Sequence, residues 1–334
     1  MLLVSNSIAH LLVDAVCDSV IFFYGKDQEL AAAAMLYNTL AFAGQAPAGA
    51  FIDGLKSRAA RSGFKLGACF AVAAAFLIPG MPLIIRIVLA GAGNCFFHVC
   101  AGVDTIEDSK GKAAPLGVFV APGAIGLAFG VLYPLTGEYT ALALIAIGIV
   151  TALSAGKGAQ KMEAGLDISE SKPTFLLPAV LLTAAVMVRA FGGSIVSFPW
   201  KSGNAAALFL AFAVFLGKSL GGFASDRFGA AKTALITIIP SALLTAFAQS
   251  LMVPSLAGQL LLNVSMPITL WLLYKKLPGR PGTAFGLAAA ALWPGTLAGS
   301  YLAPAVTLAP YVTLAAFGFA LFAVYCSSKR GERQ

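Results

Sequence analysis

The chain has 334 residues, of which 59% are hydrophobic and only 11% are charged, with a mean hydropathy of +0.88. Soluble domains carry about 25% charged residues, so this composition excludes most soluble folds. A bilayer core about 30 Å thick needs roughly 20 apolar residues per helix, so twelve crossings would leave room only for short loops.

Apolar stretches follow one another along the whole chain and predict twelve membrane-spanning helices. No ten-residue alternating segments of the kind found in membrane barrels interrupt them. The sequence therefore predicts an all-α polytopic membrane protein. The spans have approximate bounds 3–23, 28–52, 64–79, 81–104, 114–135, 139–156, 174–198, 203–225, 231–249, 251–274, 282–302 and 305–327.

Basic residues are distributed unevenly between the predicted connections. Most of the 22 lysines and arginines lie in even-numbered connections and in the C-terminal tail, whereas the odd-numbered connections hold only Lys26 and Lys201. Short loops rich in Lys and Arg stay on the cytoplasmic side, which predicts cytoplasmic termini in the cell (inner) membrane. The first apolar run lacks a cleavage pattern, so we expect the first span to be retained.

The longest hydrophilic segment divides the chain nearly in half. We expect six-helix bundles over 1–156 and 174–328, a cytoplasmic linker over 157–173 and a cytoplasmic tail over 329–334. Gly49 to Asp53 at the end of the second span is similar to Gly222 to Asp226 at the end of the eighth, and Pro122-Gly123 corresponds to Pro294-Gly295. Six helices lie between the members of each pair, as in parallel repeats related by an axis along the membrane normal.

The segment from Gly222 to Gly229, with Lys232 beyond it, resembles the signature loop between helices 2 and 3 of the major facilitator superfamily of secondary transporters. The first-half copy keeps Gly49 and Asp53 but has Lys56-Ser57 in place of the usual Arg-x-Gly. Instead of having a role in this motif, Asp53 could be an ordinary solvated loop carboxylate. This alternative applies less readily to Asp226.

Two further motifs support the resemblance. Ala121 to Gly126 resembles the glycine-proline motif common in antiporters, and Arg86 followed by Gly91 and Gly93 resembles the helix-4 arginine motif. The resemblance implies two six-helix bundles that rock about a central site, with the first, fourth, seventh and tenth spans around it. By the same resemblance the gating residues would be Gly49, Asp53, Gly222, Asp226, Arg227 and Gly229, and the helix-bending residues Pro122, Gly123, Pro294 and Gly295.

Ionisable residues form a stripe on each of two predicted spans. His10, Asp14 and Asp18 recur at four-residue spacing on the first span and therefore share a face. The fourth span carries a second stripe of Arg86, Asn94 and His98. Because a charge in a membrane helix costs a few kcal/mol, we expect both stripes to face a partner, each other or the substrate path.

These residues lead to a proton-coupling hypothesis. We expect Asp14 or Asp18 to take up and release a proton, with Arg86 as the neighbouring charge that tunes this step. The alternative is a permanent Asp–Arg pair that only stabilises helix packing. Arg189 in the seventh span could link the halves, bind an anionic group of the substrate or snorkel to the interface. Lys218 is expected to snorkel toward the cytoplasm.

The predicted function is thus proton-coupled secondary active transport of a small organic solute by alternating access, as export by antiport or as organic-anion symport. One alternative is transport of a divalent transition metal, for which His10, Asp14, His98 and Cys95 are weak candidate ligands. Another is a non-transporting sensor or enzyme on a similar fold. No phosphate-binding loop, serine elbow or zinc-protease motif is present, so we expect no enzyme activity and no cofactor. The basic residues lie mostly in short loops, so we expect no nucleic-acid partner. We also expect a monomer.

Overall fold

The computed structural model describes residues 1–55, 57–156, 176–302 and 309–329, and in these ranges the chain forms helices and no strand. The predicted linker over 157–173 and most of the predicted tail lie outside the described residues. Ten helical segments are long and apolar enough to cross a membrane: Leu2–Tyr24, Arg58–Leu77, Leu83–Asp108, Ala114–Leu132, Pro134–Ser154, Leu176–Ser194, Gly203–Phe228, Ala230–Phe247, Met252–Lys276 and Ala309–Ser328.

Two further columns are built from shorter pieces and bring the number of crossings to about the twelve predicted. The first consists of α2 (Leu30–Asn38), the π-helical turn η1 (Thr39–Ala43) and α3 (Gln45–Gly54). The second consists of α13 (Pro281–Ala290) and α14 (Leu292–Leu302). Both are interrupted near their middle, which is why neither qualifies as one long helix.

The remaining elements follow the predicted order. The first half holds α1 (Leu2–Tyr24), α4 (Arg58–Leu77), α5 (Leu83–Asp108), α6 (Ala114–Val120), α7 (Gly123–Leu132), the short η2 (Pro134–Thr136) and α8 (Gly137–Gly156). The second half holds α9 (Leu176–Ser194), α10 (Gly203–Phe228), α11 (Ala230–Phe247), α12 (Met252–Lys276) and α15 (Ala309–Lys329).

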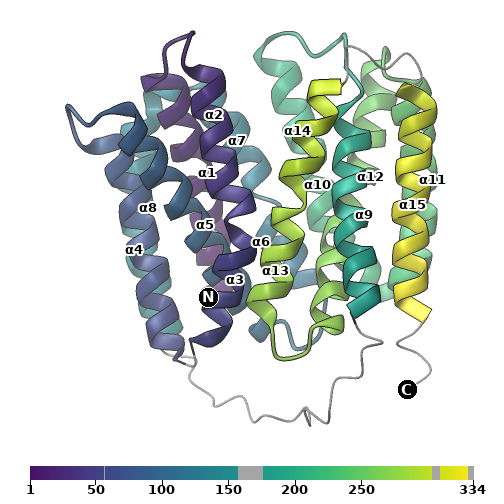
Figure 1. Ribbon diagram of the computed structural model, residues 1–334, viewed down its shortest axis with the longest axis horizontal. Helices are drawn as coiled ribbons and strands as arrows, with labels where there is room; N and C mark the ends of the chain where they lie inside the picture. Colours follow the sequence, from purple (N-terminus) through teal and green to yellow (C-terminus); the bar gives the residue numbers. More distant parts are fainter. Residues whose placement is uncertain (56, 157–175, 303–308, 330–334) are drawn as a thin grey trace.

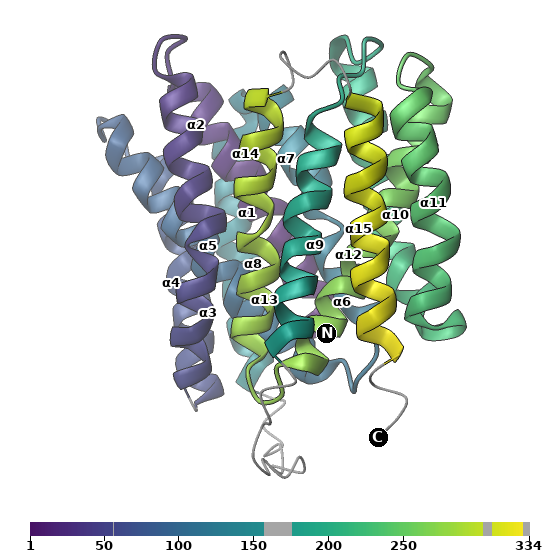
Figure 2. The same ribbon diagram turned by 45° about the vertical axis from the view of Figure 1, so that its right-hand side comes forward.

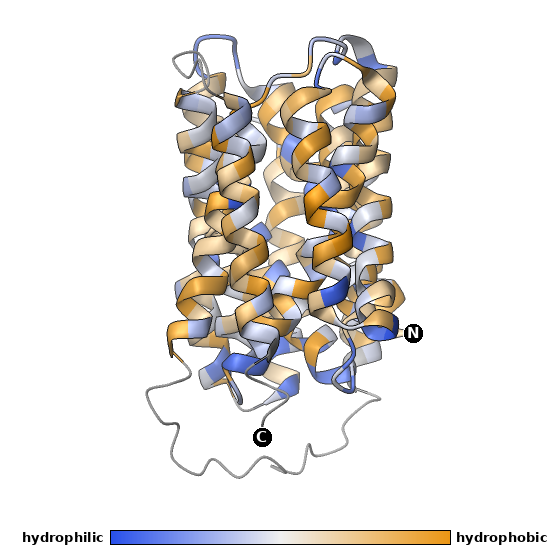
Figure 3. Ribbon diagram, turned by 90° about the vertical axis from the view of Figure 1, so that its right-hand side faces the viewer, coloured by the Kyte–Doolittle hydropathy of each residue, from blue (hydrophilic) through white to orange (hydrophobic). Residues whose placement is uncertain are grey.

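The helices gather into two groups, those up to α8 on the left and those from α9 on the right of Figure 1. Each group has its own hydrophobic core, one formed almost entirely by residues before 145 and the other by residues after 178. The outer surface of the helices is mostly hydrophobic, and hydrophilic residues collect toward the two ends and in the loops (Figure 3). This distribution suits helices that face lipid along their length.

We call the end at which α1 begins and α15 ends, the lower end in Figure 1, the termini end, and the opposite end the distal end. The two groups meet mainly where α3 packs on α13, side by side in Figures 1 and 2, and where α6 packs on α10. Both contacts lie toward the termini end. The distal pieces α2 and α14 do not pack extensively on each other.

Glycine makes these contacts between the two groups possible. A methyl group on Gly49 of α3 would overlap the carbonyl group of Gly282 of α13, and one on Gly222 of α10 would overlap the carbonyl group of Ala113 before α6. Small residues let helix backbones approach closely in membranes. Both pairs of backbones therefore touch in a way that larger side chains would prevent.

Candidate functional site

The polar residues predicted on the first and fourth spans meet around the carboxylate of Asp14. Asn94 donates a hydrogen bond from Nδ2 to Asp14 Oδ1 at 2.9 Å. The Nε2 atom of His10 lies 3.3 Å from Asp14 Oδ2, and that of His98 lies 3.6 Å from Oδ1. The two imidazole rings meet edge-on with their centroids 4.3 Å apart. We call these four buried residues, His10, Asp14, Asn94 and His98, the Asp14 cluster.

Both histidines present a basic nitrogen to the carboxylate. His10 Nδ1 lies 2.8 Å from the Phe119 carbonyl oxygen, and His98 Nδ1 lies 2.8 Å from the Asn94 carbonyl oxygen. A carbonyl oxygen only accepts, so each Nδ1 must carry the proton. In the neutral rings each Nε2 therefore holds a lone pair directed toward Asp14. Three basic sites therefore converge, an arrangement whose chemistry suits a cation.

The interruption between α6 and α7 explains how His10 is held. Pro122 has no N–H group and cannot bond to the carbonyl oxygen of Val118. That oxygen instead accepts from the Ser7 hydroxyl at 3.3 Å, and the neighbouring Phe119 oxygen is the one paired with His10. The predicted bending motif in the fifth span thus supplies hydrogen-bond acceptors to α1. The column formed by α13 and α14 is likewise interrupted, at Ala291, three residues before Pro294.

Tyr37 extends the cluster to α2 and was not predicted from the sequence. Asn94 Nδ2 also lies 2.9 Å from the Tyr37 hydroxyl, which accepts a hydrogen bond, and the Tyr37 side chain is buried. Tyr37 stands two residues before the π-helical turn η1, and such turns occur often at functional sites. A single tyrosine in an alanine-rich segment has no periodic pattern. The only signal in the sequence was its polar hydroxyl within an apolar segment.

Asp18 does not join the cluster. It lies one turn beyond Asp14 on α1, half-buried, and its Cβ atom packs close to Gly130 of α7. Among the described residues it forms no hydrogen bond or ion pair. Of the two aspartates predicted as proton carriers, only Asp14 is surrounded by groups that respond to its charge.

The expected pairing of Arg86 with these aspartates is not formed. The Arg86 guanidinium donates to the carbonyl oxygens of Ala75, Phe76, Ile78 and Met81 at 2.6 to 3.2 Å and lies 3.7 Å from the centroid of the Tyr24 ring. The last carbonyl groups of α4 lack partners within their helix and attract the cation more strongly than a distant carboxylate. Arg86 therefore caps the distal end of α4 instead of tuning the cluster.

The C-terminal half contributes two cations near the centre. Arg189 of α9 is buried and donates to the Ser265 hydroxyl and to the Met266 sulfur, both on α12. Lys218 of α10 is half-buried and lies within electrostatic range of Asp14, His98 and Arg189. Its partial burial and its electrostatic interaction with groups of the first half favour an inward position over the predicted snorkelling to the surface.

Cys95 is not a fourth donor to the cluster. It packs among apolar residues of α3 and α5, including Ala48, Ile52 and Val99. The His10, Asp14 and His98 donor atoms lie within 4.8 Å of one another and form, among the described residues, a three-ligand group without sulfur. Of the predicted weak metal candidates, the structure therefore brings three together and leaves out the cysteine.

Both predicted gate carboxylates bond to the beginning of a helix in the opposite half. Asp53 accepts from the N–H groups of Gly282 and Thr283 at 2.6 and 2.7 Å, and from the Thr283 hydroxyl at 2.6 Å. Asp226 accepts from the N–H groups of Ala113 and Ala114 at 2.8 and 2.9 Å. A carboxylate at this place satisfies unpaired donors and complements the helix dipole.

The other gating candidates have simpler roles in this conformation. Gly49 and Gly222 provide the close backbone contacts described above. Gly229 joins α10 to α11 with φ of 85°, a conformation that favours glycine. Arg227 is exposed and lies 5.6 Å from the centroid of the Phe228 ring, with no ion pair among the described residues.

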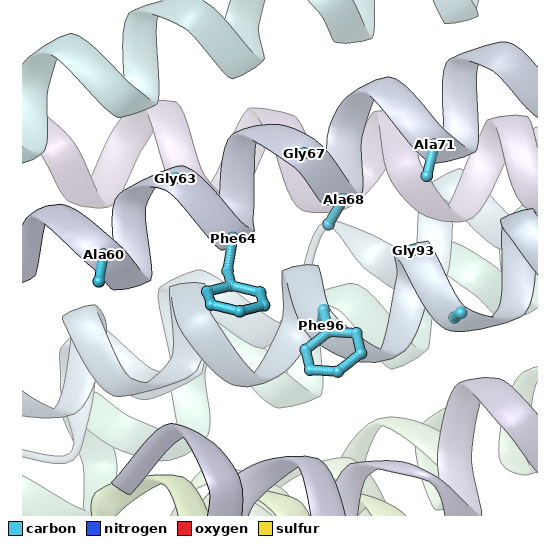
Figure 4. Close-up of a pocket in the computed structure, with 9 residues that line it drawn as sticks. Ala60, Gly63, Phe64, Gly67, Ala68, Ala71, Gly93 and Phe96 are labelled. Atoms are coloured by element: carbon cyan, nitrogen blue, oxygen red, sulfur yellow. The ribbon is translucent and has the colours of Figure 1, made fainter. Parts of the chain in front are cut away.

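A groove without any residue of the Asp14 cluster lies on the outer surface of the first half. It measures about 560 Å³ and runs between α4 and α5, where Phe64 and Phe96 stack with ring centroids 5.8 Å apart (Figure 4). Its walls carry no charged side chain. We assign no transport role to it.

Comparison with known proteins shows similarity at the level of structure. No protein-family model and no curated protein sequence matches the chain. A crystal structure of a variant of the E. coli fucose:proton symporter aligns with a TM-score of 0.69 and 14% identity over 98% of each chain. A bacterial homologue of the iron transporter ferroportin in an outward-facing state aligns with a TM-score of 0.70 and 14% identity, covering 99% of this chain and 100% of that one.

Both neighbours are described as a transporter or a homologue of one. The apolar helices and the alignments over the whole chain show a multi-pass membrane protein. The chain has the fold of the major facilitator superfamily, with two bundles of helices around a central interface.

Proposed function

We propose that the protein is a proton-coupled secondary active transporter of a small organic solute that works by alternating access, and that the Asp14 cluster is its proton-binding site. The observation that carries the proposal is the convergence of two imidazole Nε2 atoms on one buried carboxylate. The protein acts as a monomer in the cell (inner) membrane with the termini end in the cytoplasm, an orientation supported by the basic residues of its loops.

A proton bound at this cluster is shared by coupled groups. With both histidines neutral, Asp14 is the only charge, and it is held by one donor from Asn94. One added proton turns an imidazole into a donor and makes the cluster neutral as a whole. A second would place two cations in rings 4.3 Å apart, which repel each other strongly in a low dielectric. The cluster therefore takes up one proton per cycle.

The gates connect this site to the movement of the bundles. Asp53 and Asp226 hold the two halves together at the termini end, and opening that end must break both sets of hydrogen bonds. The hydrogen bond from Asn94 to Tyr37 links the proton site to the bend in the column that carries Asp53. A proton on the cluster gives Asp14 a second donor and offsets its charge, which weakens its bond to Asn94 and thereby changes the support of this bend.

The test is flux in proteoliposomes loaded with a fluorescent pH indicator. Small carboxylates, sugars, amines and amino acids are added outside, and proton movement is followed with and without an imposed pH gradient. We expect at least one solute to move protons through the wild type and none through Asp14→Asn. Asp27→Asn, which removes an exposed carboxylate, serves as the control. Solute flux that ignores pH and survives Asp14→Asn would remove the proton mechanism.

Transport of a divalent transition metal is the second candidate, favoured by the same three donors. Metal-bound histidines typically donate their other nitrogen to a carbonyl oxygen or carboxylate, as His10 and His98 do here. The donor atoms lie within 4.8 Å of one another, so a metal about 2.1 Å from each requires only a small inward movement. One structural neighbour is a homologue of an iron transporter.

Cobalt binding separates the two candidates. Purified protein is titrated with Co²⁺ and the visible absorption of the ion is recorded. A metal transporter would give a saturable band that disappears in His10→Ala and in His98→Ala but remains in Cys95→Ser. No saturable band, together with solute-driven proton flux, would leave the organic solute as the transported species.

A further inference from the structure

Two buried or half-buried cations of the second half lack an anionic partner. Arg189 is 4% exposed, and both groups that accept from it, the Ser265 hydroxyl and the Met266 sulfur, are neutral. No carboxylate of the described residues forms an ion pair with it. A buried guanidinium without a counter-charge is costly, and membrane proteins keep such groups mainly for function.

Lys218 shows the same lack of a partner. It forms no hydrogen bond or ion pair among the described residues, although it lies within electrostatic range of Arg189. The buried lysine of the first half behaves differently, since Lys65 donates to Asp104 at 2.6 Å and to Asn6 at 3.0 Å. The fold thus neutralises a buried lysine where the charge serves packing, but leaves two like charges near each other in the second half.

Arg189 and Lys218 both lie beside helix α12. A methyl group on Gly217 would lie 2.9 Å from the Cβ atom of Asn263, so Asn263 packs against α10 beside Lys218. Asn263 lies two residues before Ser265 and three before Met266, within one turn of α12, and these two residues contact Arg189 of α9. Arg189 and Lys218 therefore lie beside α12 at about the same level along its axis, where Asn263, Ser265 and Met266 carry no charge.

We infer that Arg189 and Lys218 form the substrate-binding site for an organic anion that carries a carboxylate or a phosphate monoester. This inference rests on the proposed transport function and names its substrate class. Arg189 provides a planar fork that fits such oxygen pairs, and Lys218 provides a point charge. The anion supplies the counter-charge that the two side chains lack.

The same geometry links anion binding to proton binding. Lys218 also lies within electrostatic range of Asp14 and His98 across the interface between the halves. An ionised Asp14 repels an incoming anion and attracts Lys218, and a proton on the Asp14 cluster removes both effects. Proton and anion therefore favour each other's binding, and this coupling is reciprocal. The structure in this way favours symport of the anion with a proton.

The experiment measures binding to the purified full-length protein in detergent by thermal stabilisation. The probes are matched pairs: benzoate and benzamide, lactate and lactamide, succinate and succinamide, glycerol 3-phosphate and glycerol. We expect at least one anion to stabilise the protein and its neutral counterpart to have no effect. Affinity should weaken about tenfold or more in Arg189→Gln and in Lys218→Gln, since each loses a charged hydrogen bond. Lys201→Gln removes an exposed lysine and should bind normally.

A second readout tests the coupling and separates the two proposals. Affinity for the anion should rise as the pH falls in the wild type, and this dependence should vanish in Asp14→Asn. Arg189→Lys keeps the charge, and anion binding by this variant would show that the loss in Arg189→Gln does not come from unfolding. The inference is overturned if no anion binds better than its neutral counterpart, or if Arg189→Gln and Lys218→Gln bind as the wild type does. Proton-coupled flux of a neutral solute would overturn it and leave the proposed function intact, whereas anion binding without proton coupling would do the reverse.

Discussion

The two halves of the molecule share their architecture and their gates but differ in the charges they place at the centre. Asp53 and Asp226 make equivalent bonds to the beginning of a helix in the opposite half. The first half then buries a carboxylate with two histidines, whereas the second buries an arginine near a lysine. In the proposed mechanism the repeated parts of the fold serve the movement of the bundles, and the parts that differ bind the proton and the anion.

The largest effect is expected from closing the space at the repeated glycines. Gly49→Leu and Gly222→Leu would place side chains where backbones now touch, and overpacking of about 3 kcal/mol would make the closed termini end more than about 100-fold rarer. Both variants should therefore lose nearly all transport in proteoliposomes. Gly54→Leu on the same helix as Gly49 meets open space and is the control. Normal transport by either interface variant would show that the two contacts do not form a gate.

The gate carboxylates should have equal and somewhat smaller effects. Asp53→Asn and Asp226→Asn each weaken hydrogen bonds from backbone N–H groups to a charged oxygen, worth about 1.5–3 kcal/mol. We expect either change to raise labelling of a cysteine at the termini end by a hydrophilic thiol reagent about tenfold or more. The first-half motif departs more from the family pattern, so an effect confined to Asp226→Asn would mean that only the second gate restrains the bundles.

Arg86 and Arg189 provide a comparison between the arginines of the two halves. Arg86→Gln removes donors from the carbonyl groups at the end of α4 and should destabilise the protein by about 2 kcal/mol, seen as a lower melting temperature. When the transport rate of this variant is normalised to the amount of folded protein, its pH dependence should match that of the wild type. Arg189→Gln should instead alter anion binding. A shifted pH profile for Arg86→Gln would restore its predicted role beside the aspartates.

The smallest effect is expected at Tyr37. Tyr37→Phe removes the hydroxyl that accepts from Asn94, a neutral hydrogen bond worth about 1 kcal/mol, so proton-driven flux should fall only a few-fold. Tyr139→Phe, at an exposed tyrosine, controls for the loss of a hydroxyl. An unchanged rate in Tyr37→Phe would remove the link between the proton site and the bend in the column of α2 and α3.

Much of the site could be read from spacing along single helices. Four-residue recurrence placed His10 with Asp14, and Asn94 with His98, on common faces, because a helix repeats every 3.6 residues. Spacing could not decide which of Asp14 and Asp18 meets the fourth span, since both lie on the same stripe. Nor could it reveal Tyr37 or the inward position of Lys218, because both depend on how neighbouring helices are rotated.

The sequence by itself determined the membrane setting, the order of the helices and the repeat of the gates, because hydrophobicity, helical period and turn motifs act over short stretches of chain. The tertiary structure alone decided the partners of the charges. Arg86 bonds to the end of α4, and His10 bonds to a carbonyl oxygen near Pro122, because a buried charge or donor takes the nearest unsatisfied acceptor once the helices pack. Those acceptors come from other segments of the chain, so no local sequence pattern predicts them.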